Sequence, residues 1–219
     1  MMGTTHIAVG ALAASAVAAA VGHIEITPAL LMSAEFGALL PDLDSPQAML
    51  ASRIPGSFII GGIFGHRHAT HSLVAWAVVS VLAILFLRKL TGEAGDFIVY
   101  ALGPGKLQAG VQQILHSFSV FMGPGAGIGL SIGYLSHLLA DSFTEKGMWL
   151  FWPFYNHPVK PLGPLGFIST GGPGDTFFMV GAFLLVALYD WRAAFAAVLG
   201  VFVFWVLLGR PRIFHWRIR

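Results

Sequence analysis

The chain has 219 residues, of which 56% are hydrophobic and only 10% are charged, and its formal net charge is +2. A soluble domain usually carries about a quarter charged residues, so this composition excludes a soluble globule and predicts an integral membrane protein. The chain contains no cysteine, which excludes disulfides and thiolate metal sites, so that a bound transition metal would need nitrogen and oxygen ligands.

Six apolar runs predict an all-α, polytopic membrane protein with about five to six transmembrane helices. The runs lie at about residues 4–22, 28–40, 71–87, 115–140, 176–189 and 192–208. A transmembrane helix needs about 20 residues, so the second and fifth runs are short and would have to tilt or pack against neighbouring helices. We expect a single integral membrane domain over residues 1–219, with the metal-site motifs in 4–175 and the C-terminal helices and basic tail in 176–219.

The first run also has features of a secretory signal peptide. However, no Lys or Arg precedes its apolar part, and further apolar runs follow it. We therefore expect a helix that is retained. Small residues recur at four-residue spacing in the first and fourth runs, which predicts close helix packing and not a ligand site. They are Gly10, Ala14, Ala18 and Gly22, then Gly125, Gly129 and Gly133.

The chemically active side chains of the apolar part fall at the ends of predicted helices. They are His6, Asp42, Asp44, His66, Arg67, His68, His71, His137 and Asp141. When the helices cross the bilayer alternately, all of these ends lie on the same side of the membrane. Ionisable groups near membrane depth are costly and need a partner or a function, so their convergence predicts a shared site.

The residue types and spacings favour a metal site. His137 and Asp141 are four residues apart and share one helix face, while Asp42 and Asp44 lie in a turn bracketed by prolines. Imidazole and carboxylate ligands suit zinc, with manganese or iron as alternatives, and we expect one or two ions. The predicted metal ligands are His6, Asp42, Asp44, His66, His71, His137 and Asp141. His68 is left out because its position does not require it to face inward.

Each of these residues, taken alone, also has a structural explanation. An interfacial histidine can cap a helix, an Asp before Ser-Pro can form a turn, and a His/Asp pair can simply share a hydrogen bond. Arg67 can be an interfacial anchor or a clamp for phosphate or carboxylate. Thr70, Ser72 and Ser136 are predicted to donate hydrogen bonds to the ligand carboxylates. The loop "STGGPGD" ends in Asp175, which would cap the next helix or add a carboxylate.

The distribution of basic residues predicts the orientation. Eight Lys and Arg residues fall on the site side of the predicted topology and four on the other, which marks the site side as cytoplasmic, although the Arg88-Lys89 pair argues the other way. The tail "RPRIFHWRIR" reads as a membrane-surface anchor, so no nucleic-acid partner is expected.

Four motifs occur in order along residues 4–175, and together they resemble the YdjM-like family of inner membrane proteins. They are "TTHIAVG", "GALLPDLDSP", "HRHATHS" and "GYLSHLLADSFTEKGMWLFWP". The family is described as membrane-bound metal-dependent hydrolases. The resemblance implies roles for His6, Asp42, Asp44, His66, Arg67, Thr70, His71, His137, Asp141 and Thr144.

The same family looks distantly similar to the zinc-dependent phospholipase C and P1 nuclease group. That group binds zinc through His and Asp, including an H-x-x-x-D motif that would here be His137 and Asp141. This resemblance implies phosphoester chemistry. The group also uses a free N-terminal residue, which has no mapped counterpart here, and Asp175 stands where a Glu is expected.

We therefore expect a multi-pass hydrolase of the inner (cytoplasmic) membrane that cleaves an ester or phosphoester of a lipid or lipid-linked substrate. The bound ion would activate water, Asp44 would accept its proton, and Arg67, with Thr70 nearby, would stabilise charge on the reacting oxygen. Two alternatives stay open: a metal-ion transporter, and a structural or regulatory membrane protein without catalysis. Transporters often show internal repeats and ionisable groups at mid-bilayer, and this sequence shows neither.

Overall fold

The structure is a computed structural model that describes most of the chain. It covers residues 1–54, 57–65, 67–91, 99–102, 104–144, 147–160, 169–189, 191, 194–195, 198–199 and 202. Within these ranges the regular structure is helical, with no strand beyond one isolated pairing of Met148 with Val159. The predicted all-α class is therefore confirmed for the described part. His66 and most of the sixth apolar run lie outside the described residues.

The first two helices form a pair joined by a short connection. α1 (Gly3–Val21) ends at Gly22, whose φ of 71° is left-handed and whose N–H donates to the carbonyl of Ala18. Glycine adopts this conformation at little cost, which explains the helix end. α2 (Pro28–Gly37) starts with Thr27, whose hydroxyl accepts the N–H of Leu30 and so caps the helix.

Short helical turns, not a long helix, carry the chain from α2 to the next apolar helix. They are η1 (Pro41–Asp44), η2 (Ala51–Arg53), α3 (Ser57–Phe64) and η3 (Ala69–His71). α4 (Leu73–Thr91) follows, so the third helix begins two residues later than predicted, because the Ser72 hydroxyl caps it by accepting the N–H of Ala75.

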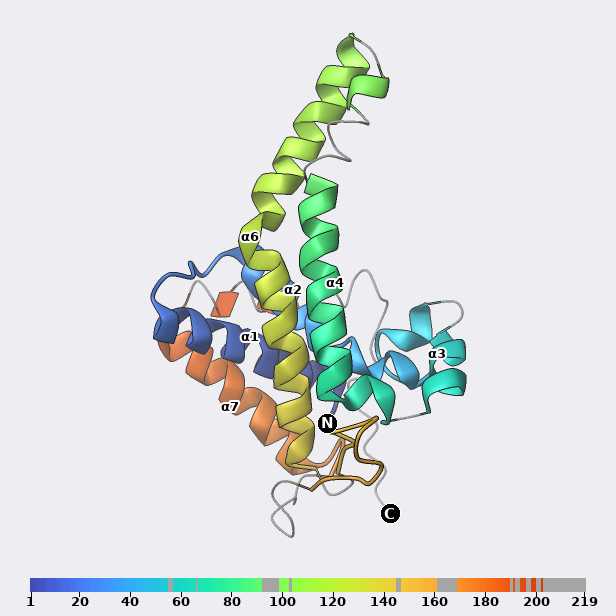
Figure 1. The fold of residues 1–219 in the computed structure, drawn as a ribbon. Helices are drawn as coiled ribbons and strands as arrows, with labels where there is room; N and C mark the ends of the chain where they lie inside the picture. The colour runs from blue at the N-terminus through green and yellow to red at the C-terminus, as the bar shows by residue number, and fades with distance from the viewer. Residues whose placement is uncertain are drawn as a thin grey trace.

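α6 (Lys106–Ser142) is the longest helix in the described part of the chain, and the other helices lie around it. In Figure 1 it runs beside α4, while α1, α2 and α7 (Pro173–Tyr189) gather around its C-terminal half. α4 and α6 are joined by polar contacts: the Trp76 indole N–H donates to the Ser131 carbonyl at 3.0 Å, and the Ser80 hydroxyl donates to that of Ser131 at 2.9 Å. Such contacts hold apolar helices together in a membrane.

The small residues predicted to pack do so where α2 crosses α6. A β-carbon on Gly133 would lie 1.8 Å from the Ala34 carbonyl oxygen, and one on Gly129 would lie 2.2 Å from that of Leu30. Gly10 of α1 is similarly close to Ala34, at 2.9 Å. The packing interpretation is therefore supported at these positions, whereas Gly22 serves as a helix end.

The predicted number of membrane spans is not confirmed. Among the described residues, α1 is the one helix long and apolar enough to cross a bilayer, and Leu73–Leu87 and Pro173–Leu188 are shorter apolar segments. α2 has 10 residues and would reach only about 15 Å along its axis. Although α2 is short, the turn that follows it, Pro41–Asp44, lies against α6. This contact brings Asp42 toward the site.

Candidate metal centre

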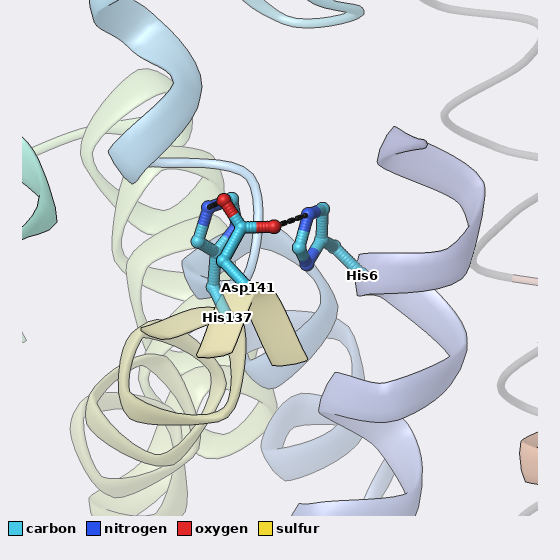
Figure 2. Close-up of side chains that lie close together, drawn as sticks. All are labelled: His6, His137 and Asp141. Atoms are coloured by element: carbon cyan, nitrogen blue, oxygen red, sulfur yellow. Dashed lines mark ion pairs between the residues drawn. The ribbon is translucent and has the colours of Figure 1, made fainter. Parts of the chain in front are cut away.

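Residues that are far apart in the sequence meet at one place. Figure 2 shows His6 of α1 facing His137 and Asp141 of α6. The rings of His6 and His137 stack with centroids 3.7 Å apart, and His6 Nε2 lies 3.4 Å from Asp141 Oδ1. All three side chains are buried. The predicted one-turn spacing of His137 and Asp141 thus directs both toward the first turn of α1.

A second group joins them from the turns between α2 and α4. His71 Nε2 lies 3.2 Å from His137 Nε2, and Asp42 Oδ1 lies 3.8 Å from both of these nitrogens. Asp141 Oδ2 is also 3.8 Å from both. The donor atoms of a tetrahedral ion with bonds of about 2.0–2.1 Å are about 3.3 Å apart. The side chains are therefore spaced nearly as an ion would require.

The other ring nitrogens of His71 and His137 have partners that set their tautomers. His137 Nδ1 donates to the Ala38 carbonyl at 2.7 Å. His71 Nδ1 lies 3.1 Å from the Thr70 hydroxyl and 3.4 Å from Asp44 Oδ2, while the Thr70 hydroxyl itself donates to Asp44 Oδ2. A neutral imidazole has one donor nitrogen, so in the neutral form of both rings Nε2 carries the lone pair, as metal-binding histidines require.

Two lone pairs facing each other at 3.2 Å repel unless a cation lies between or beside them. In addition, both ring nitrogens of His6 are buried without a hydrogen-bond partner. Buried polar atoms of this kind are costly. Two sets of side chains have ligand atoms close enough to hold an ion: His6, His137 and Asp141, and Asp42, His71 and His137. The donor chemistry thus fits a divalent ion bound by nitrogen and oxygen.

Asp44 occupies a different place from the one predicted. It lies behind His71, where its Oδ2 accepts from the Thr70 hydroxyl and from the backbone N–H of Arg67 at 2.8 Å. It belongs to neither set of candidate ligands. This arrangement matches a carboxylate that orients a metal-binding histidine, and it also gives the predicted Thr70 contact to a carboxylate.

Arg67 reaches the site through an unusual backbone. Its φ is 63°, which is uncommon for a residue with a β-carbon, and the bond from its N–H to Asp44 holds it there. Its Nη2 lies 3.2 Å from Asp141 Oδ2, while Nη1 is buried with no hydrogen-bond partner. Arg67 thus neutralises Asp141 and retains a donor that is not used.

Asp141 contacts several neighbours at once. Besides His6 and Arg67, its Oδ1 lies 2.8 Å from the backbone nitrogen of Met1, and its carbonyl accepts from the Thr144 hydroxyl at 2.7 Å. Its two oxygens therefore face different neighbours, Oδ1 toward the start of α1 and Oδ2 toward the other histidines and Arg67.

Asp175 lies outside both ligand sets, at the first turn of α7. Fully buried, it accepts from the Thr5 hydroxyl, from Met2 N at 2.8 Å and from Gly171 N at 2.9 Å. It therefore fastens the first turn of α1, and with it His6, to α7. Its position after "GGPG" predicted a cap. Its contact with Thr5, 170 positions away, could not be predicted from the sequence.

The other predicted residues take structural places. Ser72 and Ser136 donate to the backbone carbonyls of Ala69 and Gly133, not to ligand carboxylates. The His68 ring contacts that of Trp149 at a tilt of 55°, with centroids 4.0 Å apart, which agrees with leaving His68 out of the ligands. His66 lies outside the described residues.

Sequence reasoning missed two groups. The Ala38 carbonyl holds His137, and the Tyr134 hydroxyl donates to the Thr70 carbonyl at 2.5 Å. Only the spacing of Tyr134, three residues before His137, hints that the tyrosine shares the site's helix face.

Among the described ligand candidates Asp42 is closest to solvent, with a side chain 19% exposed. Burial raises the pKa of the Asp42 carboxyl to about 6, although the neighbouring His71 acts in the opposite direction. A proton therefore competes for this carboxylate at mildly acidic pH.

Comparison with known proteins places the chain among inner membrane proteins. A model of the family described as "YdjM inner membrane protein" matches residues 1–214. The "Inner membrane protein YdjM" of Escherichia coli (strain K12) is 33% identical over 140 residues, which cover 60% of this chain and 57% of that protein. The protein of the same name from Shigella flexneri matches equally. The chain thus spans little more than half the length of these two relatives.

A further relative is similar over most of its length. The "Uncharacterized protein YvsG" of Bacillus subtilis (strain 168) is 27% identical over 190 residues, which cover 86% of this chain and 94% of that protein. No solved structure matches the chain. The similarity to the phospholipase C and P1 nuclease group therefore stays a prediction from the motifs.

Proposed function

Because the chain belongs to the YdjM family of inner membrane proteins, we propose that it is a multi-pass membrane hydrolase that binds a divalent ion. Its substrate is an ester or phosphoester of a lipid or lipid-linked molecule. The observation that carries the proposal is the pair of Nε2 atoms of His71 and His137, which face each other at 3.2 Å with their lone pairs inward.

The ion would be held by His71, His137, Asp42 and Asp141, with His6 on the Oδ1 side of Asp141. Zinc is the first candidate and manganese or iron the alternatives, since the donors are imidazole and carboxylate. When bound, such an ion supplies Lewis acidity and lowers the pKa of water toward neutrality.

The surrounding residues prepare this chemistry. Asp44 and Thr70 orient His71, and the Asp44 oxygen that accepts from Thr70 and from Arg67 N is already occupied, which supports an orienting role for Asp44 over that of a base. Arg67 carries a fixed positive charge beside Asp141 and has an unused Nη1 donor. A guanidinium in this place suits an anionic oxygen of the substrate.

A lipid substrate is supported by the depth of the site. His6 lies in the first turn of α1, the candidate span, so the cluster is at the end of this candidate span and not at its centre. The excess of basic residues on the same side supports a cytoplasmic opening. The H-x-x-x-D arrangement of His137 and Asp141 on α6 supports a phosphoester, rather than another ester, as the bond that is cleaved.

The test combines metal analysis with hydrolysis. Purified protein is expected to contain stoichiometric metal and to hydrolyse phospholipid or lipid-phosphate vesicles, whereas His71→Ala is expected to lose both. His23→Ala, which removes an exposed histidine, is the matched control and is expected to behave like the unchanged protein. An active protein whose His71→Ala variant stays equally active would contradict the proposal, and so would a metal-loaded protein that leaves every such substrate intact.

A structural role is the second candidate, favoured by the ion pairs that Asp141 makes with Arg67 and with Met1 N. In that case a proton lies between the two histidines, and the cluster only joins helices. This alternative predicts protein without bound metal and no loss of stability on chelation.

A further inference from the structure

A short aromatic loop, residues 149–155, stands out beside the metal centre. Its sequence is "WLFWPFY", and no Asp, Glu, Lys or Arg occurs between Met148 and Val159. Phe151 is 48% exposed, Phe154 87% and Tyr155 52%. Apolar area of this kind is unfavourable in water, and it lies next to a site that the proposed hydrolase would use.

The base of the aromatic loop is fixed to the site. Met148 and Val159 exchange two backbone hydrogen bonds, of 3.0 and 2.7 Å, which close the loop. The N–H of Leu73 donates to the Leu150 carbonyl at 2.9 Å, and the Trp149 ring lies 4.0 Å from that of His68. The loop is thereby attached at both sides of His71, while its tip points away from the protein.

The length of α1 relates the site to the membrane boundary. α1 has 19 residues, so it extends about 28 Å along its axis, close to the thickness of about 30 Å of a bilayer's hydrocarbon core. If α1 spans, its first turn, which carries His6, lies at one boundary. In Figure 1 the segment after α6 lies at this same end of the bundle, close to the N-terminus. Aromatic rings with a polar edge favour this boundary.

We propose that the aromatic loop inserts into the lipid headgroup layer and so places the opening of the metal centre in that layer. The loop's surroundings favour lipid over a protein partner, since the loop is continuous with helix ends of a membrane protein and offers no charged group for a protein partner to pair with. The insertion stands independently. That the substrate enters from this layer rests on the proposed function.

The chain contains no cysteine, so single cysteines can carry an environment-sensitive fluorophore without background. Three variants are compared in vesicles of phosphatidylethanolamine and phosphatidylglycerol: Phe154→Cys in the loop, Ala16→Cys on the exposed side of α1, and Glu25→Cys beyond its other end. Lipids brominated near the headgroup are expected to quench the label at 154 most. Lipids brominated deep in the chains should quench the label at 16, and aqueous iodide the label at 25.

Three results would overturn the insertion. A label at 154 that iodide quenches as strongly as the one at 25 places the loop in water. Strongest quenching by deep bromines places it inside the hydrocarbon. Protection from both kinds of quencher means that another protein, or a second copy of the chain, covers the loop.

The second arm tests entry from the lipid layer. Phe154→Ser is expected to raise the apparent KM for phospholipid vesicles while leaving kcat unchanged, and to leave hydrolysis of a monomeric short-chain phospholipid unaffected. Tyr100→Ser, which removes an aromatic ring 84% exposed outside the loop, should change neither. An equal loss on both substrates would contradict entry from the layer. Absence of hydrolysis in the unchanged protein would contradict the proposed function, and the quenching result would still decide the insertion.

Discussion

His137 shows how the partner of one ring nitrogen determines what the other can bind. Its Nδ1 is held by the Ala38 carbonyl at 2.7 Å, so Nε2 is left facing His71. His71 has the same division, with Thr70 and Asp44 at Nδ1. His6 differs, because neither of its nitrogens has a hydrogen-bond partner. The pair of oriented histidines is therefore the firmest part of the proposed centre.

Removing the hydroxyl of Thr70 is expected to weaken metal binding. Thr70→Val deletes the donor to Asp44 and the partner of His71 Nδ1 while keeping the side-chain shape, so the ring loses its orientation. Changes to such outer partners typically cost about 10–100-fold in metal affinity, and titration with zinc in competition with a chelator measures this. Thr70→Ser keeps the hydroxyl and is expected to restore the affinity. Equal affinities for all three proteins would contradict the orienting role.

The raised pKa of Asp42 predicts how metal binding depends on pH. Because its carboxyl titrates at about 6, a binding ion has to displace a proton below this pH, and affinity falls as the pH falls. The contribution of Asp42 is up to about tenfold per pH unit. The stability of the metal-free protein changes with pH in the opposite direction. Because the pKa of the Asp42 carboxyl is raised, the folded state binds more protons than the unfolded state between about pH 4 and about pH 6. The free energy of unfolding therefore declines as the pH rises through this range.

Calorimetry in buffers of different ionisation enthalpy counts the protons released on binding. At about pH 5, Asp42→Asn is expected to release close to one proton fewer per ion than the unchanged protein, and at neutral pH the two should differ little. Equal release by the two proteins at both pH values would contradict the prediction that the ion displaces a proton from the Asp42 carboxyl.

At the scale of elements, the contact of α2 with α6 determines where the site residues lie. Gly129 and Gly133 let α6 approach the backbone of α2, and the Ala38 carbonyl just beyond α2 then reaches His137, one turn after Gly133. The helix packing and the hydrogen bond that orients the ligand thus depend on the same short separation.

Gly133→Ala is expected to separate the two helices. Its β-carbon would lie 1.8 Å from the Ala34 carbonyl oxygen, so α6 has to move, and overpacking of this kind costs about 1–3 kcal/mol. The melting temperature in detergent should fall, and metal affinity should fall with it because His137 shifts. Gly110→Ala, on the same helix, adds a methyl group with nothing within 4 Å. It is expected to keep both properties, and a similar loss in Gly110→Ala would contradict the packing explanation.

Much of this arrangement was predictable because it follows from periodic patterns. Four-residue spacing identified the small residues of α6 and the His137–Asp141 pair. The prediction of a shared site included His6, His71 and Asp42, which do lie beside that pair. The extent of α2 was not predictable, because the apolar run continues to Leu40 although the helix ends at Gly37, before the 3-10 turn at Pro41–Asp44. Hydrophobicity alone does not report where a helix ends.

Roles that depend on distant hydrogen bonds were also beyond the sequence. Asp42 and Asp44 are equivalent by pattern, yet one faces the histidines' Nε2 atoms and the other lies behind His71. Asp175 contacts Thr5 across 170 positions. Such pairings come from tertiary packing and leave no local spacing to recognise.

At the scale of the whole molecule, the centre joins segments that the chain keeps far apart. It lies where α1, the η1 and η3 turns and the end of α6 meet, and Asp175 adds α7 through Thr5. In the absence of an ion, several carboxylates and imidazoles remain buried together, which disfavours the folded state. An ion that binds only the folded protein would therefore stabilise all of these elements at once.

Removal of the ion is accordingly expected to lower the melting temperature of the entire bundle. A ligand present at about 100 times its Kd stabilises the folded state by about 2.7 kcal/mol, and adding a strong chelator should remove this amount. His137→Ala, which lacks the residue shared by both candidate ligand sets, should melt at the same temperature with and without chelator. His23→Ala should respond like the unchanged protein. If elemental analysis shows that chelation removed the ion, and melting stays unchanged, the centre does not join the helices. If His137→Ala retains the response, the ion binds elsewhere in the chain.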